Sequence, residues 1–254
     1  MKYSLKKWML LLVVAMFAPG LIFGDIYLGV FPNPVVHAQS VSPKSHAQKI
    51  IDGLAAIYPS DVLPTYVLTE NDPLYVTAAT TGSRNQDDFN ILYYAEDKPI
   101  EINDLAVNNL TPIAAFQKST YDTEQHAADA VQQVLDLQGQ KVDLGYGITG
   151  YMQGAAGSSY LNWQEGNWSL VVQASNIDNE DPVPLAKEIV TYLEEIYLPA
   201  PTSVGQITLR VTPTGNYKDN TVIWQDGNIV YKVSHYDAMH AVIMAGSITN
   251  PTEQ

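Results

Sequence analysis

The 254-residue sequence contains no cysteine and few basic residues. Without cysteine, the chain cannot form disulfides, use a thiol nucleophile, bind zinc through thiolates or carry a lipid on an N-terminal cysteine. Its 13 Lys and Arg face 27 Asp and Glu, for a formal net charge of −14. This balance argues against nucleic-acid binding, because sequence-independent binding depends on basic side chains that neutralise phosphates. Hydrophobic residues make up 46% of the chain and charged residues 16%, which indicates a packed core rather than a disordered chain.

Several signatures of enzymes are also missing. The sequence has no Gly-x-Ser-x-Gly nucleophile elbow and no His-Glu-x-x-His zinc site. Gly145, Gly147 and Gly150 spell Gly-x-Gly-x-x-Gly, but a strand is expected after them instead of the helix that would bind a pyrophosphate. The sequence therefore predicts no catalytic constellation, no metal and no cofactor.

The N-terminus has the layout of an export signal. Three lysines precede an apolar stretch from Trp8 to Phe23, and Val36-His37-Ala38 offers small or aliphatic residues at the positions that a signal peptidase reads. We therefore predict a signal peptide over residues 1–38 and a mature chain that begins at Gln39.

The alternative is an uncleaved membrane anchor over residues 8–31, which is long enough to span about 30 Å of hydrocarbon. Pro19-Gly20 would interrupt such a helix, and the preceding lysines would keep its start in the cytoplasm. Both interpretations place the rest of the chain outside the cytoplasm, either secreted or anchored to the outer face of the membrane. We expect the cell envelope of a Gram-positive bacterium.

The exported part is strongly acidic. It keeps 10 of the 13 basic residues and 26 of the 27 acidic residues, for a net charge of −16. Anionic lipid headgroups repel such a surface, so membrane contact is expected only through residues 8–31, and only if the signal is not cleaved.

The remaining pattern predicts a short polar linker over residues 39–44, a single domain over residues 45–248 and a tail over residues 249–254. Apolar residues at helical spacing predict four helices, and β-branched and aromatic runs between turn residues predict strands. The alternation of hairpins with single helices indicates an α+β fold, in which an antiparallel sheet carries its helices on one face. The expected helices are His46–Tyr58, Thr123–Leu137, Val183–Tyr197 and Asp237–Ile248, and the expected strands are Leu74–Thr81, Phe89–Tyr94, Lys141–Tyr151, Ser159–Trp163, Trp168–Ala174, Gln206–Thr212, Thr221–Trp224 and Ile229–Ser234.

An internal repeat is visible in this order. Leu161–Asn167 reads Leu-Asn-Trp-Gln-Glu-Gly-Asn, and Val222–Asn228 reads Val-Ile-Trp-Gln-Asp-Gly-Asn. An alternating strand follows each copy, and similar segments follow the helices that end near Ile57 and Ile196. We predict a duplicated helix-plus-hairpin unit inside one domain.

Two interpretations of the repeated Trp-Gln-acid-Gly-Asn sequences remain open. The acid–Gly pair suits a tight hairpin turn in which Gly takes a positive φ, and each Trp can pack on the sheet. Alternatively, the aromatic rings form a platform that stacks on a sugar or a peptide. The candidate ligand-binding residues are Trp163, Trp168, Trp224 and Tyr231.

The stretch from Gly150 to Leu193 combines Gly-x-x-Gly, a strand that reaches Trp163, an acid–Gly turn, a second strand and a helix. Ile223 to Ile248 repeats the later part of this pattern. The pattern resembles uncharacterised exported LolA-like domains of Gram-positive bacteria, which often lie outside the membrane beside anti-sigma factors or sporulation lipoproteins. The resemblance implies a curved antiparallel sheet with helices against it, and binding rather than catalysis. This chain differs in lacking a lipobox cysteine.

The sequence thus favours an exported, non-enzymatic module of the cell envelope that binds an unknown envelope protein, peptide or wall polymer. The alternative is a glycosidase-like envelope hydrolase, because two positioned carboxylates suffice for glycoside hydrolysis.

Overall fold

The computed structural model describes residues 41–68, 72–81 and 88–249. Residues Ser40–Gln254 form one compact unit. The predicted signal peptide, its anchor alternative and the last five residues of the predicted tail lie outside the described residues. In the described part of the chain, no helix is long and apolar enough to cross a membrane.

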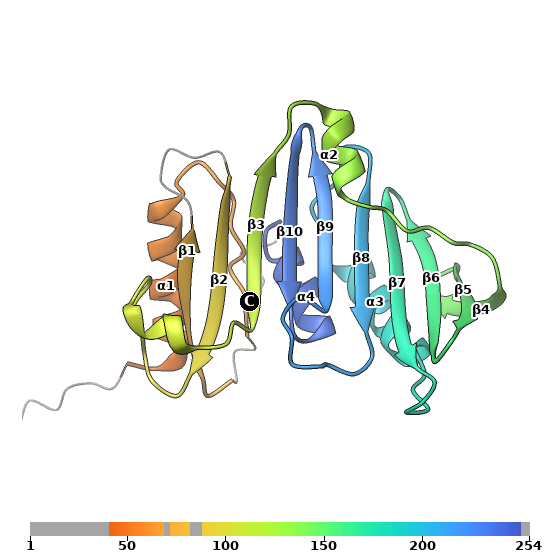
Figure 1. The fold of residues 1–254 in the computed structure, drawn as a ribbon, viewed down its shortest axis with the longest axis horizontal. Helices are drawn as coiled ribbons and strands as arrows, with labels where there is room; N and C mark the ends of the chain where they lie inside the picture. The colour runs from red at the N-terminus through yellow and green to blue at the C-terminus, as the bar shows by residue number, and fades with distance from the viewer. Residues whose placement is uncertain (1–40, 69–71, 82–87, 250–254) are drawn as a thin grey trace, which may run out of the picture. The chain divides into compact units, whose positions relative to one another are not determined.

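Ten strands form one sheet in the order β1-β2-β3-β10-β9-β8-β7-β6-β5-β4 (Figure 1). Every neighbouring pair is antiparallel except β7 and β8, which are parallel and are connected through α3. The predicted α+β class with an antiparallel sheet is therefore confirmed. The strands are β1 Tyr75–Thr81, β2 Phe89–Glu96, β3 Ala114–Thr120, β4 Gln140–Gly145, β5 Ile148–Ala155, β6 Ser158–Glu165, β7 Trp168–Ser175, β8 Gly205–Arg210, β9 Asn220–Asp226 and β10 Ile229–His235.

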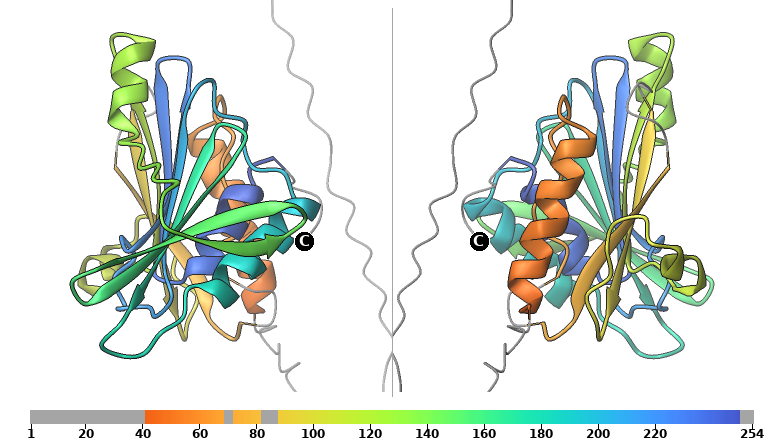
Figure 2. Two further views of the ribbon diagram at one scale, coloured as in Figure 1. Left: turned by 90° about the vertical axis from the view of Figure 1, so that its right-hand side faces the viewer. Right: turned by 90° about the vertical axis from the view of Figure 1, so that its left-hand side faces the viewer.

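The helices cover both faces of the sheet. α1 (Pro43–Ile57), α3 (Val183–Glu195) and α4 (Ala238–Gly246) pack on one face, and α2 (Glu124–Ala130) lies on the other (Figure 2). The expectation that all helices share one face is therefore wrong for α2. Its buried side chains pack on a small apolar cluster on the outer face of β9 and β10, which gives a second helix layer a place to bury its apolar side. A short 3₁₀ helix, η1 (Leu105–Asn109), connects β2 to β3.

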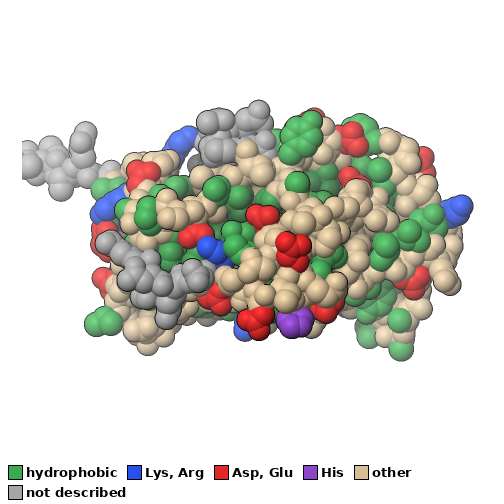
Figure 3. Space-filling model, turned by 90° about the horizontal axis from the view of Figure 1, so that it is seen from above, with side chains coloured by type: hydrophobic (Ala, Val, Ile, Leu, Met, Phe, Trp, Pro, Cys, Tyr) green, Lys and Arg blue, Asp and Glu red, His purple; other side chains and the backbone are tan. Residues whose placement is uncertain are grey.

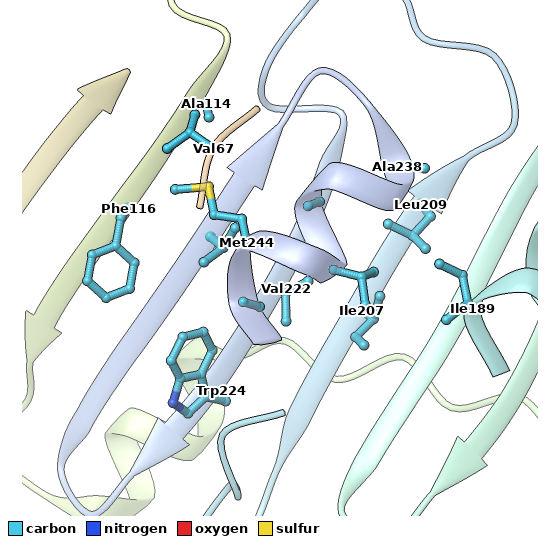
Figure 4. Packing of buried hydrophobic residues seen from close by; sticks show 14 of the residues in the cluster. Val67, Ala114, Phe116, Ile189, Ile207, Leu209, Val222, Trp224, Ala238 and Met244 are labelled. Atoms are coloured by element: carbon cyan, nitrogen blue, oxygen red, sulfur yellow. The ribbon is translucent and has the colours of Figure 1, made fainter. Parts of the chain in front are cut away.

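The main core lies between the sheet and helices α1, α3 and α4. Alternation along the strands directs Ile207 and Leu209 of β8 into this core, while the residues between them face the other side. Figure 4 shows Met244 of α4 extending towards Val67 and Ala114, and Ile189 of α3 beside Leu209 and Ile207 of β8. Full burial of such a side chain stabilises the fold by about 1.5–3 kcal/mol, so this layer holds the helices on the sheet.

Helix α1 begins earlier than its sequence pattern predicts. Ser42 is the N-cap, and its Oγ accepts a hydrogen bond from Ser45 N at 3.2 Å. Pro43 occupies the first turn, where its missing N–H costs nothing. The last two residues of the predicted linker therefore belong to the helix.

The predicted helix over Thr123–Leu137 is wrong in its second half. α2 ends at Ala130, and the chain then crosses the outer face of the sheet towards β4 (Figure 1). Gln133 Nε2 donates to Ser169 Oγ at 2.7 Å, and Val134 N donates to Gln206 Oε1 at 2.7 Å. These bonds to the sheet replace the helical ones, so tertiary contacts override a helical sequence pattern.

The predicted strand Lys141–Tyr151 is also wrong, because it is a hairpin of two strands, β4 and β5. Tyr146 and Gly147 make the turn with φ of 53° and 82°. The Gly-x-Gly-x-x-Gly letters thus belong to a hairpin, as expected for a chance match. Strand β3, which joins β2 to β10, was not predicted.

Candidate functional site

The structure places the predicted tryptophans in the core. Trp163, Trp168 and Trp224 are 0%, 8% and 3% exposed, and only the ring of Tyr231 is partly exposed. Trp224 lies between two of the others, with ring centroids 6.3 Å from Trp168 and 5.3 Å from Tyr231. The four rings therefore do not form the exposed platform that the second interpretation of the repeat requires.

Both copies of the repeated turn make the same internal contacts. Gly166 and Gly227 take φ of 57° and 58°, the left-handed region expected of them. Gln164 Nε2 donates to the Gly166 carbonyl at 3.0 Å, and Gln225 Nε2 donates to the Gly227 carbonyl at 2.6 Å. In each copy, the glutamine side chain thus stabilises the turn through a hydrogen bond to the glycine two residues later.

The asparagine of each turn bonds to a neighbouring backbone segment. Asn167 Nδ2 donates to the Pro201 carbonyl at 3.2 Å, and Asn228 Nδ2 donates to the Tyr121 carbonyl at 2.8 Å. Each of these turn residues therefore has a structural task, as the turn interpretation predicts.

The most enclosed candidate site lies elsewhere. A cavity of about 230 Å³ lies between the N-terminal half of α1, residues 65–68, 72 and 74, and strands β1 and β2. We call it the α1 pocket. Apolar side chains form most of its inner wall, and Lys44, Gln48 and Asp72 bring polar groups to it. Its lining residues are Pro43, Lys44, Ala47, Gln48, Ile50, Ile51, Thr65, Tyr66, Val67, Leu68, Asp72, Leu74, Val76 and Tyr93.

Tyr93 is the unusual residue of the α1 pocket. Alternation along β2 directs Phe89, Ile91 and Tyr93 towards the core, and Tyr93 is only 1% exposed. Its hydroxyl is buried and has no hydrogen-bond partner among the described residues. Burial, with a smaller contribution from Tyr58, raises the pKa of Tyr93 and keeps its hydroxyl neutral. An unsatisfied buried hydroxyl costs about 1–3 kcal/mol, so a bound group that forms a hydrogen bond with it would stabilise the fold.

Tyr66 connects the α1 pocket to a cluster at the start of α4. One side of Tyr66 lines the pocket, and its ring centroid lies 6.0 Å from that of His240. Burial raises the pKa of Tyr66 to about 12, and the charges of Asp237 and Asp72 add to this shift. Tyr66 is therefore a neutral hydroxyl donor at the wall of the pocket.

The nearby Asp237–His240 pair is explained by helix capping. Asp237 is the N-cap of α4, and its Oδ1 accepts from His240 N at 3.0 Å and lies 3.1 Å from His240 Nδ1. The His240 side chain beside the carboxylate, together with the bond from His240 N, lowers the pKa of Asp237 to about 2. The carboxylate is therefore ionised and acts as a helix cap, not as a proton donor.

Among the described residues, no group of three or more His, Asp and Glu side chains is placed to hold a metal ion. Sequence reasoning did not find the α1 pocket. One signal was present, because Tyr93 carries a hydroxyl at a core-facing position of the predicted strand Phe89–Tyr94.

No protein-family model matches the chain, and neither a curated protein nor a solved structure matches it. The resemblance to LolA-like domains stays a prediction.

Proposed function

We propose that this protein is an exported, non-enzymatic binding module that takes a small ligand into the α1 pocket. The observation that carries the proposal is a cavity of about 230 Å³ whose lining includes Tyr93, a residue whose buried hydroxyl has no partner among the described residues. Ligand sites combine a largely apolar wall with a few polar groups that fix orientation, and the α1 pocket has both.

The lining indicates the chemistry of the ligand. Ile50, Leu74 and Val76 suit an apolar body, and Tyr93 suits one polar group at the inner end. Because the phenol of Tyr93 stays neutral, this group is an uncharged or weakly polar donor or acceptor. The polar side chains of Lys44 and Asp72 would meet the outer end of the ligand.

Tyr93→Phe tests this role through two opposite effects. Without ligand, the free energy of unfolding of the variant should be about 1–3 kcal/mol higher than that of the wild-type protein, because an unsatisfied buried hydroxyl is removed. Its affinity for a compound found by native mass spectrometry on protein purified from the exporting cell should fall about fivefold or more. A destabilised variant with unchanged affinity would show that the hydroxyl serves the fold alone.

A second pair of variants fills the cavity. Ala47 lines the α1 pocket, and Ala55 is exposed on the same helix outside it. Ala47→Trp should remove the bound compound from the mass spectrum, while Ala55→Trp should retain it. If no compound accompanies the wild-type protein, or if both variants retain it, the α1 pocket is not the binding site.

The alternative, a glycosidase-like envelope hydrolase, is supported by one observation. Burial raises the pKa of Glu165, and the charge of Glu194 adds to this shift. A carboxyl with a raised pKa beside a second carboxylate is what a general acid requires. Release of reducing ends from purified cell-wall glycan, lost in Glu165→Gln, would establish the hydrolase in place of the binding module.

The wider setting of the proposal comes from the sequence. The predicted signal supports an extracytoplasmic location in a Gram-positive envelope, with LolA-like domains as the proposed relatives. The matching contacts of the two Trp turns support a duplicated helix-plus-hairpin unit. An unknown envelope protein, peptide or wall polymer stays the proposed source of the ligand.

A further inference from the structure

A second hollow, of about 430 Å³, lies between the β6–β7 turn and the chain that leaves α3. We call it the Trp168 hollow. Trp168, Leu198 and Pro201 give it apolar walls, and Tyr197 beside them is 80% exposed. Its lining thus contains one of the repeated Trp-Gln-acid-Gly-Asn turns and the residues that follow α3, neither of which lines the α1 pocket.

Trp168 is held rigidly at this hollow. A Cβ atom on Gly205 would lie 2.5 Å from Cε3 of the indole, so only glycine lets the ring lie flat over β8. On another side, Trp224 contacts the ring at a centroid distance of 6.3 Å. The 8% of Trp168 that stays exposed is therefore a preformed part of the hollow's wall, which lowers the entropy lost on binding.

The hollow is also negatively charged. Glu165 lines it, and its Oε1 accepts a hydrogen bond from Trp163 Nε1 at 2.8 Å. Glu194 does not line the hollow, but it lies in the last turn of α3, which has no basic residue, and its charge acts on Glu165. Figure 3 views the end of the molecule that bears the Trp turns and shows more acidic than basic side chains on it.

We propose that the Trp168 hollow binds a lysine or arginine side chain from a basic segment of a partner protein. Aromatic rings beside carboxylates are the environment that an ammonium or guanidinium group prefers. A partner protein is favoured over a free amine because the hollow is open towards Tyr197, whereas small-molecule sites bury most of their ligand. This site is independent of the α1 pocket.

The test uses the full chain and two synthetic peptides, one of alternating lysine and glycine and one with glutamate in place of lysine. Calorimetric titration should detect the lysine peptide and not the glutamate peptide. Glu165→Gln keeps the acceptor for Trp163, and both Glu165→Gln and Glu194→Gln should weaken binding about tenfold. Glu188→Gln is the matched control, since this exposed glutamate on α3 is neither in the lining nor among the charges that act on Glu165, and its loss changes the net charge equally.

Tyr197→Ala removes an exposed ring and should weaken binding about fivefold without changing the melting temperature. Equal weakening by all three glutamate variants would mean nonspecific attraction to an acidic protein and would overturn the proposal. Absence of binding by the wild-type protein, or equal binding of the two peptides, would also overturn it. Hydrolysis of wall glycan that depends on Glu165 would assign the hollow to an enzyme instead.

Discussion

The two tryptophans of the repeat show how one residue serves a turn and a core together. Trp163 lies fully buried on β6, and Trp224 lies almost fully buried on β9. Each is followed within the same short sequence by the glutamine and glycine that close the hairpin. The two copies of the sequence are alike because each forms the same hairpin turn beside a tryptophan that packs in the core.

Replacing either indole therefore tests the structural role directly. Trp163→Ala and Trp224→Ala should each lower the free energy of unfolding by about 3–5 kcal/mol, through lost burial and a residual cavity. Urea unfolding measures the change, and Leu105→Ala, at a residue that is 80% exposed, should unfold like wild type. Unchanged unfolding in both Trp variants would return these residues to the binding interpretation.

At the scale of elements, residues 131–139 do not form the helix that their local sequence pattern predicts. Val131, Val134 and Leu135 continue the apolar spacing of α2, yet the chain leaves the helix at Gln132 with φ of 55°. Val134 and Leu135 are 54% and 41% exposed as a result. The side chains of the outer sheet face hold this segment in place through hydrogen bonds.

The left-handed conformation of Gln132 predicts that two substitutions at this position change the free energy of unfolding in opposite directions. Gln132→Gly should raise the free energy of unfolding by about 1 kcal/mol, because glycine adopts positive φ without strain, and Gln132→Val should lower it. Gln125→Gly, inside α2, is the control and should cost about 1 kcal/mol. Calorimetric melting of the three variants gives the answer, and a destabilising Gln132→Gly would contradict the strain argument.

At the scale of the whole molecule, His235 joins the end of β10 to the segment that lines the α1 pocket. Its Nε2 donates to the Val67 carbonyl at 3.1 Å, and its Nδ1 accepts from Asp237 N at 2.9 Å. Both contacts suit a neutral ring. Burial lowers the pKa of His235 to about 4, with a further contribution from His240.

This pKa predicts a loss of stability in mild acid. Between pH 6.5 and about pH 4, His235 is protonated in the unfolded chain but neutral in the folded chain. The free energy of unfolding therefore decreases as the pH falls through this range, and it levels off below about pH 4. The free energy of unfolding should be about 2 kcal/mol lower at pH 5 than at pH 7. Asp237, with its pKa near 2, stays ionised across this window.

Urea unfolding at the two pH values measures this difference. His235→Asn should flatten the pH dependence although it weakens the fold at pH 7, and the exposed His126→Gln should leave the dependence intact. Equal unfolding free energies at pH 5 and pH 7 in the wild-type chain would show that His235 is not held neutral.

Export makes a separate prediction for the whole chain. Intact-mass analysis of protein from the culture medium or the envelope should show a chain that starts at Gln39. Full-length protein in the membrane fraction would establish the anchor over residues 8–31 instead.

Local pattern determined much of this protein. The spacing of apolar residues predicted α1, α3 and α4 within a few residues, and the acid–Gly pairs predicted the left-handed glycines at 166 and 227. These features depend on neighbours in sequence, such as side chains on one helix face or the φ that a tight turn requires, and so they can be predicted from the chain alone.

Only the tertiary structure decided where α2 stops, that α2 lies on the outer face, and that β7 and β8 pair in parallel. It alone placed Tyr93 at a cavity and brought Leu198 and Pro201 to the same hollow as Trp168. Each of these depends on contacts between residues far apart in sequence, such as Val134 with Gln206. No local periodicity encodes such contacts, because they exist only after the sheet has formed.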